Sequence, residues 1–283
     1  MLSPLGIDYP RLGLGLVLAA VISGAALRAG ALSRGGALGA VLVGGAVFGF
    51  GGPIWGGVLV GFFLSSSLLS ASGPRPAAMA ADYSKGSRRD MMQVLANGAV
   101  PTAIAVARGV SGNSLLLAGF VGAVAASTAD TWATEVGLRS SVAPRMVTTG
   151  QPVRPGTSGA ITALGSAGAA AGGIFVGLLV AVLLATQGTL AGLGPDLTVA
   201  RYLVIAPLAG LAGAALDSWL GATVQAVRCC PRCEKETERA IHSCGTPTRH
   251  VRGHPRLGGD VVNLWASLLG AAVGLAVELI VFM

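Results

Sequence analysis

Acidic residues inside long apolar segments are the first candidates for chemistry in this sequence. Asp130 and Glu135 lie near the end of one such segment, and Asp217 lies near the end of a later one. A carboxylate in a membrane helix is costly, which makes it a functional-site candidate. Thr134 shares the helical face of Asp130, whereas Glu135 lies about 140° away around the helix. We therefore expect one acid to face a metal ion while the other holds a basic neighbour.

Asp130 and Asp217 are expected at a similar depth, because each lies in the second half of a helix that crosses the membrane in the same direction. Mg²⁺ takes oxygen ligands and bridges phosphate groups, and acids beside Lys and Arg residues suit phosphoryl transfer. The pattern therefore predicts a Mg²⁺ site at Asp130 and Asp217. The alternative for Asp130 and Glu135 is a structural ion pair with Arg88 or Arg139.

A basic cluster precedes the fourth apolar stretch and contains Lys85, Arg88 and Arg89. Lys supplies a point charge and Arg a two-pronged donor, so the cluster is suited to grip a phosphate. If Arg89 opens a helix, Gln93 and Asn97 follow on its face at i+4 and i+8. The proline four residues after Asn97 would leave the Asn97 carbonyl without its usual donor. The alternative is a cluster that only sets orientation and contacts anionic lipid.

Two further polar segments flank apolar stretches. Thr157 and Ser158 lie in a Gly-Thr-Ser-Gly segment at the expected start of the sixth helix, where backbone N–H groups can bind an anion. A plain N-cap explains either residue equally well. Asp260 and Asn263 open the last stretch and share a face at i, i+3, although Asp260 is also a suitable cap. Glu278, near the opposite end, is expected to be an interfacial residue.

All four cysteines lie in the segment 228–259, with three histidines nearby. The pattern Cys230-x-x-Cys233 followed by His242-x-Cys244 has the ligand types of a Cys₃His zinc site, although its second half is tighter than usual. A zinc ion there would be structural. The alternative is free or transiently reactive thiols, since a cytosolic location argues against disulfides.

The composition decides which elements position these residues. Among 283 residues only 11% are charged and 53% are hydrophobic, the mean hydropathy is +0.72, and 44 residues are Gly. So few charges exclude an ordinary soluble enzyme, and so many apolar residues exclude disorder. The sequence predicts an all-α fold, a polytopic membrane helix bundle in which Gly and Ala allow close helix packing.

Eight apolar stretches approach the roughly 17–25 residues that a span requires. The first is expected to be a retained helix, because Asp8 and Arg11 precede it in place of the positive region of a signal peptide. The sixth is too long for one straight span, and its Gly-rich steps predict a break or a strong tilt. We expect one membrane domain over 1–283, with 228–259 inserted between the last two helices. The stretches are approximately 10–27, 35–50, 54–71, 93–108, 114–137, 156–186, 202–227 and 260–282.

The basic residues predict the orientation. With the N-terminus outside, all of the 19 Lys and Arg residues except Arg11, Arg108 and Arg201 fall in cytoplasmic loops. The positive-inside rule therefore predicts a multi-pass protein of the cell membrane with both termini outside and 228–259 in the cytoplasm. The same rule accounts for the net charge of +7, so no nucleic-acid partner is expected.

Several of these motifs occur in one order along essentially the whole chain and resemble the transmembrane-protein-19 family, also called domain of unknown function 92. That family includes the plant phytyl-phosphate kinase, and it is similar, more distantly, to CTP-dependent phytol and dolichol kinases. The Asp-x-x-Ala-x-x-x-Gly pattern of those kinases matches Asp130, Ala133 and Gly137. The motifs are Lys85–Asp90 with Gln93 and Asn97, Asp130–Gly137, Thr148–Gly150 leading to Gly156–Gly159, Asp217-Ser218, and Asp260 with Asn263.

The resemblance implies that an isoprenyl monophosphate is phosphorylated to the diphosphate, with CTP or another nucleotide as donor. On that interpretation Mg²⁺, the nucleotide and the isoprenyl phosphate are the partners, and the active site faces the cytoplasm. The catalytic residues would be Asp130, Glu135, Arg89 and Lys85. The substrate- and nucleotide-binding residues would be Arg88, Gln93, Asn97, Thr134, Thr157, Ser158, Asp217, Asp260 and Asn263.

A membrane transporter of a phosphorylated or anionic small molecule is the main alternative. Transporters usually place their binding groups near the bilayer midplane, between inverted repeats. Here the polar residues gather towards one membrane face, which favours the kinase.

Overall fold

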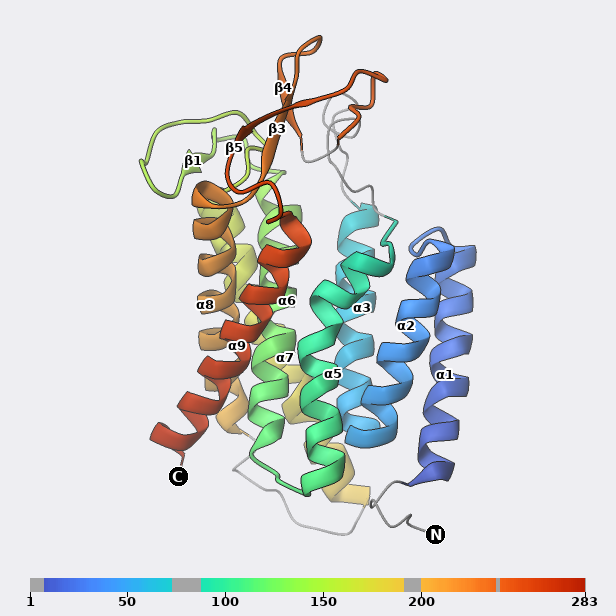
Figure 1. The fold of residues 1–283 in the computed structure, drawn as a ribbon. Coiled ribbons are helices and arrows are strands. Elements are labelled where there is room, and N and C mark those ends of the chain that lie inside the picture. Colours follow the sequence, from blue (N-terminus) through green and yellow to red (C-terminus); the bar gives the residue numbers. More distant parts are fainter. Residues whose placement is uncertain (1–7, 73–87, 191–199, 238–239, 283) are drawn as a thin grey trace.

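The computed structural model describes residues 8–72, 88–190, 200–237 and 240–282. Within those ranges eight helices are long and apolar enough to cross a membrane, which confirms the predicted polytopic bundle. They are α1 (Tyr9–Arg28), α2 (Arg34–Ala46) continued by the π-helical turn η1 (Val47–Gly51), α3 (Pro53–Ser72), α5 (Met91–Ser111), α6 (Leu116–Gly137), α7 (Ala163–Leu190), α8 (Tyr202–Thr223) and α9 (Gly259–Val281) (Figure 1).

The centre of the bundle is α6, which packs against α3, α5, α7, α8 and α9. Its residues are buried without interruption from Ala118 to Ala129. Small residues make this possible: a Cβ atom on Gly122 would overlap the carbonyl oxygen of Gly270 on α9. Helices that approach this closely gain packing contacts that larger side chains would prevent. The first ionisable side chain of this central helix, Asp130, therefore lies where the buried stretch ends.

The sixth span is one continuous helix, so of the predicted break or strong tilt the break is wrong, while the tilt stays a prediction. Helix α7 runs without interruption over 28 residues, about 42 Å at 1.5 Å per residue. Its glycines serve packing instead: Cβ atoms on Gly168 and Gly173 would lie 2.8 Å from Trp132 O on α6 and Pro207 Cα on α8. Gly-rich steps in the sequence therefore mark contacts between helices and not a kink.

Short strands lie at one end of the bundle (Figure 1). The pair β1 (Arg145–Met146) and β2 (Ala160–Ile161) is antiparallel. A second sheet contains β3 (Val227–Cys230), β4 (Lys235–Thr237) and β5 (Arg249–Arg252) in the order β4-β3-β5. The seventh helix accordingly ends at Thr223 and not at residue 227, because Val227 already pairs with Arg252 in the sheet.

The strands share their end of the bundle with the α1–α2 turn and with the start of α5, whereas the two ends of the chain lie at the opposite end (Figure 1). The loops at these two ends are therefore grouped as the distribution of basic residues predicted. The multi-pass character is established by the eight apolar helices. The cell membrane as the location, and the side on which each end lies, remain predictions.

At the end opposite to the strands, Glu278 is buried against a neighbouring helix. Its side chain is only 2% exposed and accepts a hydrogen bond from Arg201 at 2.5 Å. The Arg201 guanidinium also lies 5.3 Å from the centre of the Tyr202 ring. Glu278 therefore forms an ion pair that joins α9 to the start of α8, while its expected depth at the membrane interface stays a prediction. The sequence hid this pair because 77 residues separate its members.

Candidate functional site

Two acids from neighbouring helices meet near the strand-bearing end of the bundle. Asp130 lies about 10 Å before the end of α6 and Asp217 about 9 Å before the end of α8, counted at 1.5 Å per residue. Their side chains are hydrogen-bonded to each other. Both helices run towards the same end (Figure 1). The two aspartates thus lie at similar depth and in contact.

Alanines bring the two helices close enough for this contact. Ala129 on α6, Ala169 on α7 and Ala214 on α8 form a small buried cluster, with Ala133 packed against it. Each offers only a methyl group, so three helix backbones approach one another around the acids. The site is therefore held by packing of α6, α7 and α8, and not by loops.

Two carboxyl groups in contact share either a proton or a cation, because two bare negative charges repel each other. Carboxylate oxygens are the ligand type that Mg²⁺ takes, usually one or two from the protein together with phosphate oxygens. The residues present therefore fit a Mg²⁺ ion that is shared with a phosphate-bearing ligand.

The second acid of α6 has a separate set of partners. Glu135 accepts a hydrogen bond of 2.6 Å from Ser70 on α3, and it lies close enough to attract the Arg89 guanidinium electrostatically. Arg89 donates to the hydroxyl of Ser67, one helical turn before Ser70, at 3.1 Å. The guanidinium carbon also lies 5.3 Å from the centre of the Phe63 ring. Thus α3 joins the basic segment before α5 to the end of α6.

Arg89 does not open a helix, so this expectation is wrong. Helix α5 begins at Met91, and Asp90 is its N-cap in a capping box with Gln93. The Gln93 side chain accepts from the Asp90 N–H at 2.9 Å, and the Asn97 amide donates to the Gln93 carbonyl at 3.0 Å. In this structure both amides satisfy their own helix. Arg89 lies just outside it, where its backbone pairs with the α1–α2 turn.

Arg89, Gln93 and Asn97 nevertheless line one cavity. It has a volume of about 340 Å³ and lies between α1, α2, α3 and α5. Its other walls are aliphatic, aromatic and glycine residues, together with Ser23. The cavity is thus apolar over most of its surface, with polar groups supplied mainly by the first turns of α5 and the segment before it.

Most other predicted partners lie apart from the acids. Arg88 donates to the carbonyl of Leu32 at 3.0 Å, and Arg139 donates to Ser72 and the Leu69 carbonyl. Both arginines therefore bind backbone carbonyls of neighbouring segments. Thr134 is exposed on α6. Lys85 lies outside the described residues.

The predicted anion site at Thr157 and Ser158 has a different geometry. The helix that follows begins only at Ala163, with the Thr162 hydroxyl accepting from the Gly165 N–H at 2.9 Å. The expectation that the Gly-Thr-Ser-Gly segment opens this helix is therefore wrong. The Ser158 hydroxyl instead donates to Gln225 at 2.8 Å. Thr157 lies in the turn that leads to β2, partly buried.

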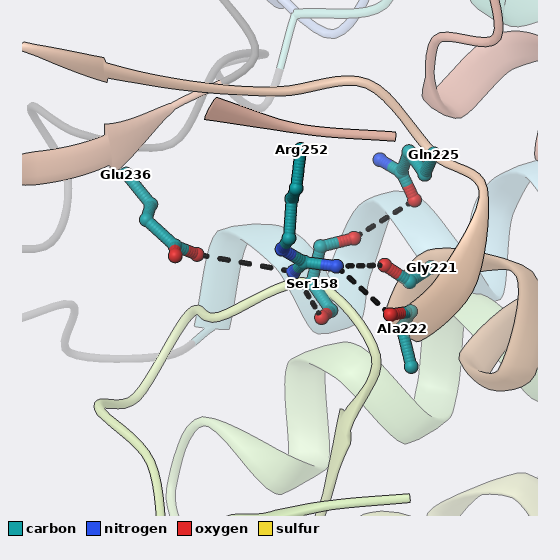
Figure 2. A network of polar contacts seen from close by, with 6 residues as sticks. All are labelled: Ser158, Gly221, Ala222, Gln225, Glu236 and Arg252. Atoms are coloured by element: carbon teal, nitrogen blue, oxygen red, sulfur yellow. Dashed lines mark hydrogen bonds and ion pairs between the residues drawn. The ribbon is translucent and has the colours of Figure 1, made fainter. Parts of the chain in front are cut away.

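Arg252 on β5 holds the Ser158 segment against the end of α8, as Figure 2 shows. Its guanidinium donates to the carbonyls of Ser158, Gly221 and Ala222 at 2.9, 2.9 and 3.1 Å. Glu236 on β4 completes the contact as an ion pair at 3.9 Å. This cluster lies one helical turn beyond Asp217 and ties the sheet to the helix that carries that acid.

The last helix contributes its first turns. Asp260 lies in the first turn of α9, with Gly258 as the N-cap, so Asp260 is not the cap itself. Asn263 follows on the same face, and both side chains are partly buried. Their positions at the strand-bearing end agree with the end at which the other polar residues gather.

The cysteine segment brings its four predicted ligands to one point. The ligand atoms of Cys230, Cys233, His242 and Cys244 all lie within 4.8 Å of one another. Hydrogen bonds with Thr246 and His242 lower the pKa of the Cys244 thiol to about 5. Contact with Cys244 instead raises the pKa of Cys233 to about 11. The protonation states of these thiols therefore depend on one another, because the sulfur atoms lie close together.

Sequence reasoning missed the two serines of α3. It also missed the contacts by which Arg252 holds the Ser158 segment against the end of α8, which we call the Arg252 clamp. Ser67 and Ser70 belong to a Ser-Ser-Ser-Leu-Leu-Ser-Ala-Ser run at the end of the third span, and this run of hydroxyls was an available signal. For Arg252 no comparable signal exists, because its partners are backbone carbonyls.

Comparison with known proteins identifies relatives in plants and archaea. Protein PGR of Arabidopsis thaliana is 30% identical over 232 residues, which cover 76% of this chain and 78% of the plant protein. The uncharacterized membrane protein MJ0933 of Methanocaldococcus jannaschii is 36% identical over 112 residues, which cover 37% of this chain and 47% of the archaeal one. No solved structure matches the sequence. The family described as integral membrane protein DUF92 matches residues 17–271. The chain therefore belongs to the DUF92 family of integral membrane proteins.

Proposed function

We propose that this protein is a membrane phosphotransferase that converts a prenyl monophosphate, such as phytyl or geranylgeranyl phosphate, to the diphosphate with CTP or another nucleoside triphosphate. The observation that carries the proposal is the contact between Asp130 and Asp217. The two acids lie towards the end of the bundle that carries the strands and most of the arginines, which we call the arginine-rich end. The resemblance of the sequence motifs to a family that includes phytyl-phosphate kinase supplies the substrate class.

In this proposal Asp130 and Asp217 hold Mg²⁺ together with the nucleotide phosphates. Mg²⁺ held by these two acids would supply positive charge that offsets the charge developing on the transferred phosphoryl group. The helices supply the positioning, because both acids project from rigid, closely packed elements. Water has little access to a pair enclosed by the alanines of α6, α7 and α8, so electrostatic interactions there are stronger than in bulk solvent.

The apolar cavity supports a lipid acceptor. A prenyl chain is a hydrocarbon, and each methylene group removed from water contributes about 0.8 kcal/mol. The cavity between α1, α2, α3 and α5 offers such walls, with Arg89 among its lining residues. We assign Arg89 to the acceptor phosphate, since a guanidinium makes two directed bonds to a phosphate. Glu135 and Ser67 then orient that guanidinium.

The direct test is an assay of the purified protein in nanodiscs with Mg²⁺. Phytyl and geranylgeranyl monophosphate are each offered with ATP, CTP, GTP or UTP, and prenyl diphosphate is measured by mass spectrometry. We expect diphosphate to form with at least one pair and to require both the nucleotide and Mg²⁺.

The same nanodisc protein serves as its own control when EDTA is added. If no combination yields diphosphate from protein that is monodisperse and intact, the kinase proposal is wrong. Proteoliposomes loaded with phosphorylated solutes then test the transporter alternative. Saturable, protein-dependent uptake would assign the arginine-rich end to substrate entry instead.

A further inference from the structure

We infer that Cys230, Cys233, His242 and Cys244 bind one structural Zn²⁺ ion, and that this ion, through Arg252, holds the loop of Ser158 against the end of α8. The inference does not depend on the proposed kinase activity. It rests on the ligand geometry, on the small apolar burial in the described residues of the sheet, and on the contacts of Arg252.

The ligand atoms already have spacings close to those of a tetrahedral site. With Zn–S of about 2.3 Å and Zn–N of about 2.0–2.1 Å, ligand atoms lie roughly 3.3–3.8 Å apart. The sulfurs of Cys230 and Cys244 are 3.6 Å apart, and His242 Nδ1 lies 3.1 Å from the Cys244 sulfur. Three sulfurs and one imidazole nitrogen in tetrahedral arrangement are typical of zinc.

Two tight turns present these ligands. Cys230 ends β3, and the N–H of Glu234 donates to the Cys230 carbonyl at 2.9 Å, which closes a turn that contains Cys233. In the second turn the N–H of Gly245 donates to the His242 carbonyl at 2.9 Å. Gly245 has φ +81°, a conformation that other residues rarely adopt. This compact turn explains why the spacing His242-x-Cys244 is shorter than in most zinc sites.

The sheet has little else to stabilise it. Its strands contain only 4, 3 and 4 residues. Of its apolar side chains Val227 is buried but Val251 is 52% exposed, and Ile241 in the segment between β4 and β5 is 62% exposed, whereas Cys230 and His242 are buried. Small units without a hydrophobic core usually depend on disulfides or a metal. All four cysteines are free thiols in this structure, so a metal is the cross-link that the cluster fits.

The pairing of β3 with β5 connects the metal site to the Arg252 clamp. Strand β3 ends at Cys230, and its first three residues pair with β5, which ends at Arg252 opposite Val227. Arg252 in turn binds the carbonyls of Ser158, Gly221 and Ala222 (Figure 2). Nearby, the backbone of His254 donates to the Val224 carbonyl at 2.8 Å. Loss of the metal would therefore release a surface that otherwise fixes the end of α8.

Zinc content measured by mass spectrometry tests the metal site. The full chain is expressed with added Zn²⁺, carries a tag without histidine, and is purified without chelator. We expect one Zn per chain in the unchanged protein and in Cys229→Ser, whose sulfur is not one of the four ligands. Cys233→Ser and Cys244→Ser should contain fewer than about 0.2 Zn per chain.

A second measurement avoids variants that fail to fold. Exchange of the unchanged protein into Co²⁺ should produce the visible absorption bands of a tetrahedral thiolate site. Absence of zinc from intact protein, iron in its place, or equal zinc loss in Cys229→Ser would overturn the site.

Limited trypsin digestion tests the link to α8. Removal of the metal, or the substitution Arg252→Gln, should accelerate cleavage after Arg145 several-fold, since the bond after Arg154 precedes Pro155 and resists trypsin. Arg252→Gln should retain its zinc, which separates the clamp from the metal. Unchanged digestion after metal removal would overturn the coupling and leave only the metal site.

Discussion

At the scale of single residues, the two acids of α6 differ because the helix points them at different neighbours. Asp130 contacts Asp217, another acid, whereas Glu135 lies near Arg89 and accepts from Ser70. An acid beside an acid needs a proton or a cation, while an acid beside an arginine is already compensated. The first arrangement is suited to recruit a metal ion and the second to position an arginine.

The substitutions Asp130→Asn and Asp217→Asn should each reduce phosphorylation by at least a hundredfold, about 2.7 kcal/mol of lost transition-state stabilisation. An amide keeps the shape of the side chain but is a poorer ligand for Mg²⁺. Steady-state kinetics with varied Mg²⁺ measures the effect. Trp219→Phe is the control, since Trp219 is 51% exposed two residues beyond Asp217. Full activity in either Asn variant would remove that acid from the mechanism.

Arg89→Lys should lower kcat/KM by tenfold to a thousandfold, about 1–4 kcal/mol. Lys keeps the charge but loses the planar fork that reaches Ser67 and the acceptor phosphate together. The matched control is Arg34→Lys, an exposed arginine at the same end of the bundle. If the basic residues only set orientation, both variants will behave like the unchanged protein.

At the scale of helices, small residues decide where the chemistry lies. Helix α6 meets α9 through Gly122 and Gly270, and it meets α7 and α8 through alanines. Interfaces of this kind admit no larger side chain, because packed interiors have few voids. The position of the acid pair therefore depends on glycines and alanines that carry no chemistry themselves.

Gly270→Leu should destabilise the bundle, because any side chain there would meet the Gly122 carbonyl oxygen. Overpacking typically lowers the free energy of unfolding by about 1–3 kcal/mol. Because the added side chain would meet backbone atoms, we expect a loss at the upper end of this range. Thermal unfolding in detergent, monitored through aggregation of the protein, should have a lower midpoint temperature for Gly270→Leu. Ala272→Leu faces outward on the same helix and should leave the midpoint unchanged. Equal midpoints for the two variants would contradict the observed α6–α9 contact.

Filling the cavity tests its assignment to the prenyl chain. Val60→Trp adds a large ring to the wall that α3 contributes. Activity with geranylgeranyl phosphate should fall at least tenfold, whereas activity with the shorter geranyl phosphate should fall much less. The control is Val182→Trp, since Val182 is well exposed on α7. A loss that is independent of chain length would indicate general disruption and not a tail-binding site.

At the scale of the whole molecule, one end of the bundle differs from the other in charge and in structure. The strands, the metal-ligand cluster and the acid pair lie towards the same end, and Arg11, Arg108 and Arg201 belong to the other. A kinase that takes a cytoplasmic nucleotide needs such an asymmetry, because donor and catalytic groups must lie on one side of the membrane.

The orientation is tested by reporter fusions. Alkaline phosphatase, which is active only outside the cytoplasm, should be active when fused after residue 283 and inactive when inserted after Gly258. A fluorescent protein at the same two positions provides the reciprocal control. The opposite pattern would turn the arginine-rich end outward and remove the nucleotide from the proposed site.

The amino-acid sequence by itself determined the eight spans, their approximate limits and the end at which the polar residues gather. These depend on local hydrophobicity and on charge counts, which need no knowledge of neighbours. The four members of the Cys/His cluster could also be named, because the spacing within a turn is a local property. The resemblance of the motifs likewise indicated the DUF92 family before any geometry was known.

Only the tertiary structure decided which of these side chains meet. The sequence offered Arg88 or Arg139 as partners for the acids, yet the helix rotations place Arg89 near Glu135 and Asp217 against Asp130. The close packing of α7 along its glycines and the Arg201–Glu278 pair were equally inaccessible to the sequence. The physical reason is the same in each case. Hydrophobicity fixes that a segment crosses the membrane, but its rotation and contacts are set by close packing against residues far away in the chain.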